Sequence, residues 1–131
     1  MIEHFDKIWW EESYLLGWER ESDTLTLFLE LYVAEGHPAF EPYDKRKEFG
    51  CYKTARLVVN ELRRADGLPS DHHGLKRNAA LGEYEDAGSI AVMTIAEESL
   101  AVAMHVSAAR SADDFLLEVQ GLSADLIFAD I

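Results

Sequence analysis

The cluster Asp71-His72-His73 has the clearest capacity for chemistry in this sequence, because imidazole and carboxylate groups bind metal ions. Adjacent histidines on an extended segment point to opposite sides, so one metal ion would need a further ligand from elsewhere in the chain. The candidates for that further ligand are His37, His105 and Glu83. Their spacing does not bring any of them to the pair. The sequence therefore favours polar loop residues at this position and predicts no metal site and no cofactor.

Nucleophilic catalysis would use Cys51, the only cysteine in the chain. Such catalysis needs a nucleophile, a base and an orienting group in contact, and His105 and Asp114 are the partners available for those roles. The sequence around these residues does not resemble that of a cysteine enzyme, and free cysteine mostly behaves as a small apolar residue. We therefore expect Cys51 to be a buried bystander, with no disulfide within this chain.

Three pairs of neighbouring acids lie at expected turns or element ends, namely Glu11-Glu12, Glu97-Glu98 and Asp113-Asp114. Catalysis by paired carboxylates requires two groups that face each other across a cleft, whereas neighbours at a turn are usually solvated. The sequence also contains no glycine-rich phosphate loop, no nucleophile elbow and no HExxH-type metal motif. These observations predict that the protein is not an enzyme.

The chain is strongly acidic, with 25 acidic and 12 basic residues and a formal charge of −13. Residues 1–49 carry −7, residues 50–87 are neutral and residues 88–131 carry −6. Such a chain repels phosphate backbones, so we expect it not to bind nucleic acid. An acidic face can instead attract a basic protein partner, although the same charge would also serve solubility alone.

Aromatic residues gather near the acidic N-terminus, and Trp and Tyr are favoured anchors of protein interfaces. The predicted partner-binding residues are Trp10, Glu11, Glu12, Trp18 and Glu19. The simpler interpretation is that most of the aromatic rings fill the core. A small-molecule pocket is the alternative function, placed under the loop 34–49 and lined by Trp18, Phe40 and Tyr43.

The elements that would position these residues are predicted most clearly by the segment Thr24–Val33, in which Leu or Val occupies every odd position. Successive side chains on a strand point to opposite faces, so this alternation predicts a β-strand with one apolar face. Phe28 and Tyr32 lie on the other face and are too apolar for a strand washed by water. We expect a second sheet, the following loop or a partner to cover them.

Other apolar segments predict further strands. The expected strands are Ser13–Arg20, which pairs with Thr24–Val33 as a hairpin, then Gly50–Leu62, Ser89–Ala96, Ser99–Ala108, a strand within 114–122, and Ala124–Ala129. A helix is the alternative over 54–65 and over 99–110. The Tyr-x-Thr and Leu-Val-Val clusters favour a strand in the first place, and the alternation and the short connection to the β-rich segment 90–95 favour one in the second. Glycine and proline predict irregular chain over 34–49 and 65–88.

One domain spanning 1–131 is therefore expected, with a mainly β fold. The predicted architecture is a single antiparallel β-sandwich or half-open barrel with at most one or two short helices. No run of about 18 apolar residues occurs, so no membrane contact is expected, and the acidic N-terminus does not resemble a signal peptide. We expect a cytoplasmic protein, and a homodimer through an exposed edge strand is a further expected mode of assembly.

The chain resembles small bacterial β-rich domain families, some of which look like immunity or accessory proteins of toxin systems. The likeness is carried by the aromatic start at Trp9-Trp10, the strand Thr24–Val33, the segment 52–59 (Y-K-T-A-R-L-V-V) and the closing segment 124–129 (A-D-L-I-F-A). Where those families often have Trp-His-Asp-Ser, residues 10–13 read Trp-Glu-Glu-Ser. The resemblance implies a protein-binding, immunity-like role and no catalytic residues.

Overall fold

Antiparallel strands make up nearly all of the regular structure in the computed structural model, which describes residues 2–46, 50–68, 76–78, 83–85, 88–96, 101–108 and 114–129. One turn of 3-10 helix, η1 (Phe5–Lys7), precedes ten strands: β1 (Ile8–Glu21), β2 (Thr24–Val33), β3 (Cys51–Asn60), β4 (Arg64–Asp66), β5 (Lys76–Asn78), β6 (Glu83–Glu85), β7 (Gly88–Ala96), β8 (Ala101–Ala108), β9 (Phe115–Gln120) and β10 (Ser123–Phe128). The prediction of a mainly antiparallel β fold is confirmed. No helix in the described part of the chain is long and apolar enough to cross a membrane.

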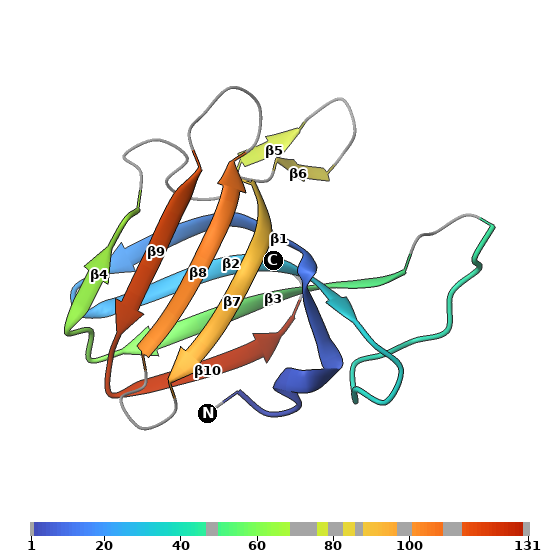
Figure 1. Cartoon of the computed structure of the whole chain (residues 1–131), viewed down its shortest axis with the longest axis horizontal. Coiled ribbons are helices and arrows are strands. Elements are labelled where there is room, and N and C mark those ends of the chain that lie inside the picture. Colours follow the sequence, from blue (N-terminus) through green and yellow to red (C-terminus); the bar gives the residue numbers. More distant parts are fainter. Residues whose placement is uncertain are drawn as a thin grey trace.

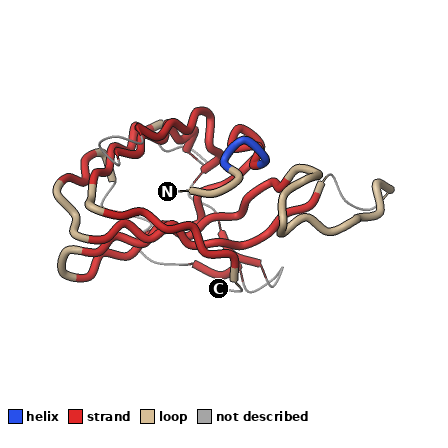
Figure 2. Tube along the Cα trace, turned by 90° about the horizontal axis from the view of Figure 1, so that it is seen from below, coloured by secondary structure: helices blue, strands red, loops and turns tan. Residues whose placement is uncertain are grey.

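Eight of the strands form one open sheet in the order β10-β3-β2-β1-β7-β8-β9-β4, and β5 pairs with β6 in a separate two-stranded ribbon (Figure 1). The large sheet bends so that its strands lie in two layers, and the N-terminal segment enters between the layers (Figure 2). Ile2 is buried with the core there. The sheet does not close into a barrel, because β10 and β4 remain its two edges.

Two chain crossings join the layers at one corner of the sheet. The Arg63 N–H donates to the Gln120 carbonyl at 2.8 Å, and the Leu122 N–H donates to the Asn60 carbonyl at 2.9 Å. The chain between β9 and β10 passes so close to β3 that a Cβ at Gly121 would lie 2.5 Å from the Asn60 carbonyl oxygen. Glycine is therefore required at this crossing.

The core is built on the alternating leucines of β2, as the sequence predicts. Leu25, Leu27, Leu29, Leu31 and Val33 are all fully buried. Apolar side chains of β3, β7, β8 and β9 pack with them into one cluster. Removing one such leucine side chain would cost about 2–5 kcal/mol, so this ladder supplies a large share of the stability.

Several local predictions need correction. Residues 51–60 and 101–108 form strands, so the helical alternatives over 54–65 and 99–110 are wrong there. β1 begins at Ile8 instead of Ser13 because irregular pairing lets the first aromatic residues join the sheet. Three-residue strands occur within the region expected to be irregular, 65–88, where partner strands and not local sequence determine the structure.

The segment between β2 and β3 projects from the body of the molecule as an arm (Figures 1 and 2). Its base is tied to the N-terminal segment, since the Ala34 N–H donates to the Lys7 carbonyl, and it contains a turn in which the Phe40 N–H donates to the His37 carbonyl. The predicted irregular loop over 34–49 is thus present, although residues 47–49 lie outside the described residues.

Candidate functional site

A wide bulge in β1 creates the candidate site. Trp9 pairs with Tyr32 and Tyr14 pairs with Glu30, so the four residues 10–13 lie opposite Leu31 alone. Such a bulge leaves backbone N–H and C=O groups without the hydrogen-bond partners that the neighbouring strand would normally supply. The Ser13 hydroxyl replaces them: it donates to the Trp9 carbonyl at 2.9 Å and accepts from the Tyr32 N–H at 2.9 Å. Ser13 is fully buried, so this bridge is shielded from water.

The bulge places Trp9 on the outer surface of the sheet. Its side chain is 53% exposed, the most exposed of the large apolar side chains described. The indole stacks on the ring of Tyr32 with 4.9 Å between ring centres and 4° between ring planes. One face of the indole is therefore held by Tyr32, and a large part of the ring is available to a partner.

Further tyrosines support the stacked pair. The Tyr52 ring meets Tyr32 edge-on at 5.2 Å, and Tyr14 lies 6.2 Å from Tyr52. We call Trp9, Tyr14, Tyr32 and Tyr52 the aromatic platform. These rings come from β1, β2 and β3, which are adjacent in the sheet, so the platform rests on rigid elements.

The arm contributes to this end of the platform. A hydrogen bond with Tyr43 raises the pKa of the Tyr32 hydroxyl, with burial as the next cause. Gly50 has no side chain where the Tyr32 ring lies, since a Cβ there would be 2.1 Å from that ring. The arm and the platform are therefore packed against each other at Tyr32.

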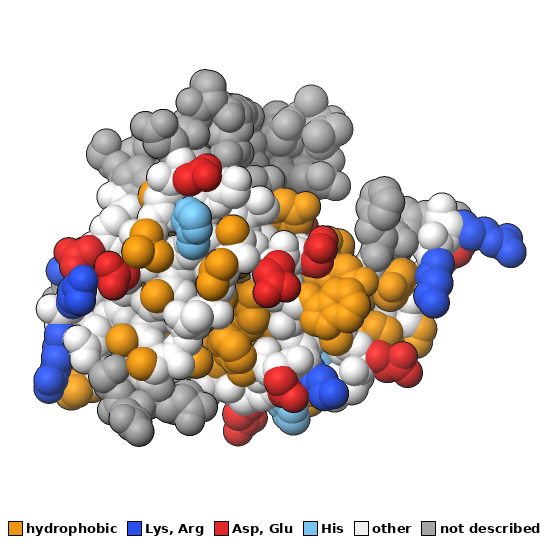
Figure 3. All heavy atoms as spheres, in the orientation of Figure 1, with side chains coloured by type: hydrophobic (Ala, Val, Ile, Leu, Met, Phe, Trp, Pro, Cys, Tyr) orange, Lys and Arg blue, Asp and Glu red, His pale blue; other side chains and the backbone are white. Residues whose placement is uncertain are grey.

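Acidic residues lie beside the platform. Burial is the largest cause that raises the pKa of Tyr52 to about 12, and the neighbouring Tyr14, Glu12, Tyr32 and Glu30 contribute to the same rise. The charge of Glu12 also raises the pKa of Tyr32. Glu11 and Glu12 are exposed within the bulge. On the face shown in Figure 3, a large hydrophobic patch with Asp and Glu side chains beside it lies next to the base of the arm.

The predicted partner-binding residues do not assemble into one surface. Trp10 and Trp18 are 5% and 2% exposed and belong to the core, where Trp18 contacts Phe115. Glu11, Glu12 and Glu19 are exposed. Glu19 pairs with Thr26, which is six residues along β2 from Tyr32, the partner of Trp9, so it lies about 20 Å from the stacked pair.

The alternative pocket is not formed by its three predicted residues. Phe40 and Tyr43 contact each other at the arm, with 6.4 Å between ring centres. Trp18 is buried on the core side of the sheet and pairs with Leu27 of β2. Leu27 is five residues along β2 from Tyr32, to which Tyr43 is hydrogen-bonded. A pocket shared by these three residues would require Trp18 to leave the core.

The other candidate chemistry is also dispersed. Cys51 is buried on β3, as expected, and its sulfur accepts a hydrogen bond from the Glu41 N–H. His105 is exposed on β8, which three strands separate from β3 in the sheet, so the two residues do not meet. The cluster Asp71-His72-His73 lies outside the described residues. Among the described residues, no group of three His, Cys, Asp or Glu side chains could hold a metal ion.

None of the four platform residues was predicted as a binding residue from the sequence, although Tyr32 was expected to be covered. The available signal was the aromatic outer face of Thr24–Val33, which requires a cover. Trp9 supplies that cover for Tyr32.

No protein-family model, curated protein or solved structure matches this chain. A function is therefore inferred from its own residues and their geometry.

Proposed function

We propose that this chain is a non-enzymatic protein-binding domain that uses the aromatic platform to bind an arginine- or lysine-containing segment of a basic partner. The observation that carries the proposal is the half-exposed Trp9 stacked flat on Tyr32. A ring of this size is normally buried, and an exposed one held rigidly in place is typical of interface anchors.

The chemistry of the platform suits a cationic side chain. A guanidinium or ammonium group over the open part of the Trp9 indole gains about 0.5–2 kcal/mol from cation–π attraction. Glu11 and Glu12 in the adjacent bulge supply carboxylates for the same group. Because the Tyr32 stack and the Ser13 bridge fix the indole in advance, little side-chain entropy is lost on binding.

The charge of the whole chain supports the same class of partner. A formal charge of −13 on 131 residues attracts a basic protein over a distance and raises its association rate at low salt. The finer proposal is a toxin-immunity-like role in the bacterial cytoplasm, because the proteins that this sequence resembles include immunity-like domains and a neutralised toxin is one kind of basic partner.

The test is capture of a partner from lysate of the source cells on immobilised chain, followed by elution with increasing salt. We expect one basic protein that is released by salt and binds Trp9→Ala about tenfold or more weakly, as for an interface anchor. Leu122→Ala is the matched control, because Leu122 is 48% exposed and bonds Asn60, which is eight residues along β3 from Tyr52 of the platform. It should retain the partner.

Charge is tested by a second pair of variants. The double change Glu11→Lys with Glu12→Lys should abolish capture at physiological salt, because it replaces two attractive groups by repulsive ones. Glu19→Lys with Glu21→Lys makes the same change in net charge far from Trp9 and should weaken capture only slightly. Equal loss in both double variants, or full capture by Trp9→Ala, would show that the platform is not the binding surface.

A further inference from the structure

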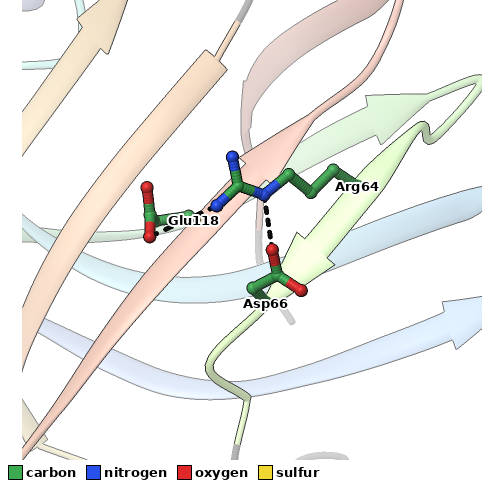
Figure 4. Close-up of polar contacts among 3 residues, drawn as sticks. All are labelled: Arg64, Asp66 and Glu118. Carbon is green, nitrogen blue, oxygen red and sulfur yellow. Dashed lines mark hydrogen bonds and ion pairs between the residues drawn. The ribbon is translucent and has the colours of Figure 1, made fainter.

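The two edges of the large sheet are protected very differently. β4, one edge, is only three residues long and carries an ion-pair network, in which Arg64 bonds Asp66 and also contacts Glu118 of β9 at 3.5 Å (Figure 4). Asp66 is the largest cause of a raised pKa at Arg64, so the charge is retained. Short length and charged side chains are the usual means by which an edge strand avoids pairing with another chain.

β10, the other edge, is less well protected than β4. It is six residues long, contains no proline, lysine or glycine, and pairs with β3 in unbroken register. Asp125 is its only charged residue, and Ile127 is 48% exposed. An exposed, regular and mostly apolar edge is a template for the addition of another strand.

The backbone groups available for that addition follow from the register. The Ala129 N–H donates to the Thr54 carbonyl, so this is a hydrogen-bonded pair of the β10–β3 ladder. Such pairs alternate with non-bonded pairs in antiparallel strands. The N–H and C=O groups of Ala124, Leu126 and Phe128 therefore point away from β3, toward the free edge.

An open groove of about 730 Å³ runs along this edge. Four consecutive residues, 125–128, line one side of the groove. Consecutive side chains of a strand point to opposite faces of the sheet, so a groove that contacts all four follows the edge of β10 and not a single face of the sheet. The other side consists of Glu3, His4, His37, Pro38 and Ala39. The groove is thus a slot between β10, the N-terminal segment and the base of the arm.

The charge of the groove selects a cationic occupant. Its lining contains two carboxylates, Glu3 and Asp125, and no lysine or arginine. His37 is 7% exposed, its Nδ1 accepts from the Ala39 N–H at 2.9 Å, and burial lowers its pKa, so it adds no positive charge at neutral pH. A second copy of this chain would bring a further −13 of charge and a second Asp125 to the same edge.

We propose that an extended segment of a basic protein pairs with β10 as a ninth strand of the sheet, with its main chain bonded to Ala124, Leu126 and Phe128 and its cationic side chains beside Glu3 and Asp125. This goes beyond the proposed function, because it concerns a different surface and a different mode of recognition. The added strand would occupy the groove and would extend the layer of the sheet that contains β3 and β10.

The test uses a synthetic nonapeptide of alternating lysine and valine with blocked ends, and a second peptide of the same sequence whose alternate amides are N-methylated. Both carry the same charge, but the second cannot complete a ladder. Binding is measured by calorimetry, and the contact site is found by amide hydrogen exchange followed by NMR. At about ten times the dissociation constant, exchange at Ala124, Leu126 and Phe128 should slow about tenfold.

Loss of the ladder bonds should weaken the N-methylated peptide about tenfold or more. Asp125→Lys should weaken the unmodified peptide about three- to tenfold, whereas Asp23→Lys, in the exposed β1–β2 turn, should change its affinity less than about twofold. Trp9→Ala should leave protection at β10 unchanged, which separates this site from the platform.

Three results would overturn the proposal. Equal affinity for the two peptides would show that charge alone is recognised. Protection confined to the amides around Tyr32 would place the peptide on the platform, which supports the proposed function and not this site. Protection of the β10 amides that rises with protein concentration, without peptide, would mean that a second copy covers the edge.

Discussion

Replacing Ser13 by alanine should destabilise the protein by about 2–4 kcal/mol, because one buried hydroxyl bridges the β1 bulge. The change removes a hydrogen bond to the Trp9 carbonyl and another from the Tyr32 N–H, both 2.9 Å long. Each backbone group left unpaired in the interior costs about 1–3 kcal/mol. Water can reach the region of half-exposed Trp9 more easily than Tyr32, so the total falls below the sum of two full penalties.

The assay is urea unfolding of the wild type and the Ser13→Ala variant, followed by circular dichroism. A domain of this size has a total stability of about 5–15 kcal/mol, so the expected change would shift the midpoint clearly at constant slope. Ser107→Ala is the matched control, because Ser107 is exposed on β8 and should change the free energy of unfolding by less than about 0.5 kcal/mol.

Local measurements make the prediction sharper. In Ser13→Ala the Tyr32 amide should exchange faster than its β2 neighbours, and Trp9 fluorescence should shift as the indole loses its fixed position. A change below about 0.5 kcal/mol with the Tyr32 amide still protected would refute the reasoning, because another group would then satisfy the bulge.

Three further predictions concern the platform and the arm. Gly50→Ala should displace the Tyr32 ring, because a Cβ at this position would lie 2.1 Å from it. The change should alter Trp9 fluorescence and lower the free energy of unfolding, measured in urea, by about 1–3 kcal/mol. An unchanged spectrum would contradict the contact. The pKa of Tyr52 is raised to about 12, so the unfolded chain loses this proton at a lower pH than the folded chain does. The free energy of unfolding should therefore fall by about 1 kcal/mol as the pH rises from about 10 to 12. This value is discounted for the partial exposure of the ring. Tyr52→Phe should reduce that alkaline loss, measured by urea unfolding across this range. Burial lowers the pKa of His37, so the stability that it contributes is present above about pH 6.5 and is lost as the pH falls through the folded-state pKa. In His37→Asn, which keeps an acceptor for the Ala39 N–H, that acid loss should be absent from unfolding curves measured over the same pH values.

The part of the fold that could be predicted from the sequence is the part in which one periodicity holds over many residues. The alternation of Thr24–Val33 identifies both the strand and its buried face, because the side-chain period on a strand is two. The last two strands, on either side of Gly121, were also expected, but β9 and β10 do not pair with each other, because the chain crosses there from one layer to the other. These segments need no knowledge of their partners to be assigned.

The misplaced tryptophans show where the sequence could not suffice. Strict alternation counted back from buried Leu15 puts Trp9 inside and Trp10 outside, and counted forward it puts Trp18 outside. Irregular pairing on each side of Leu15 inverts the alternation, so that Trp9 is exposed and the other two are buried. A bulge is defined by the pairing of two strands, and the sequence of β1 alone does not specify it.

Candidate binding features therefore gather where the alternation fails and the sheet ends. The corner made by the β3–β4 and β9–β10 crossings has short backbone bonds at Arg63 and Leu122 and a closely packed glycine, and its edge strand is short and ion-paired. The bulge with exposed Trp9 and the unprotected end of β10 both lie toward the arm and the N-terminal segment. Bulges and open edges lower stability unless something else compensates, and the leucine ladder and the closed corner do so here. Because the buried ladder and the closed corner stabilise the sheet, its surface can keep a large exposed ring and an unpaired strand edge available for a partner.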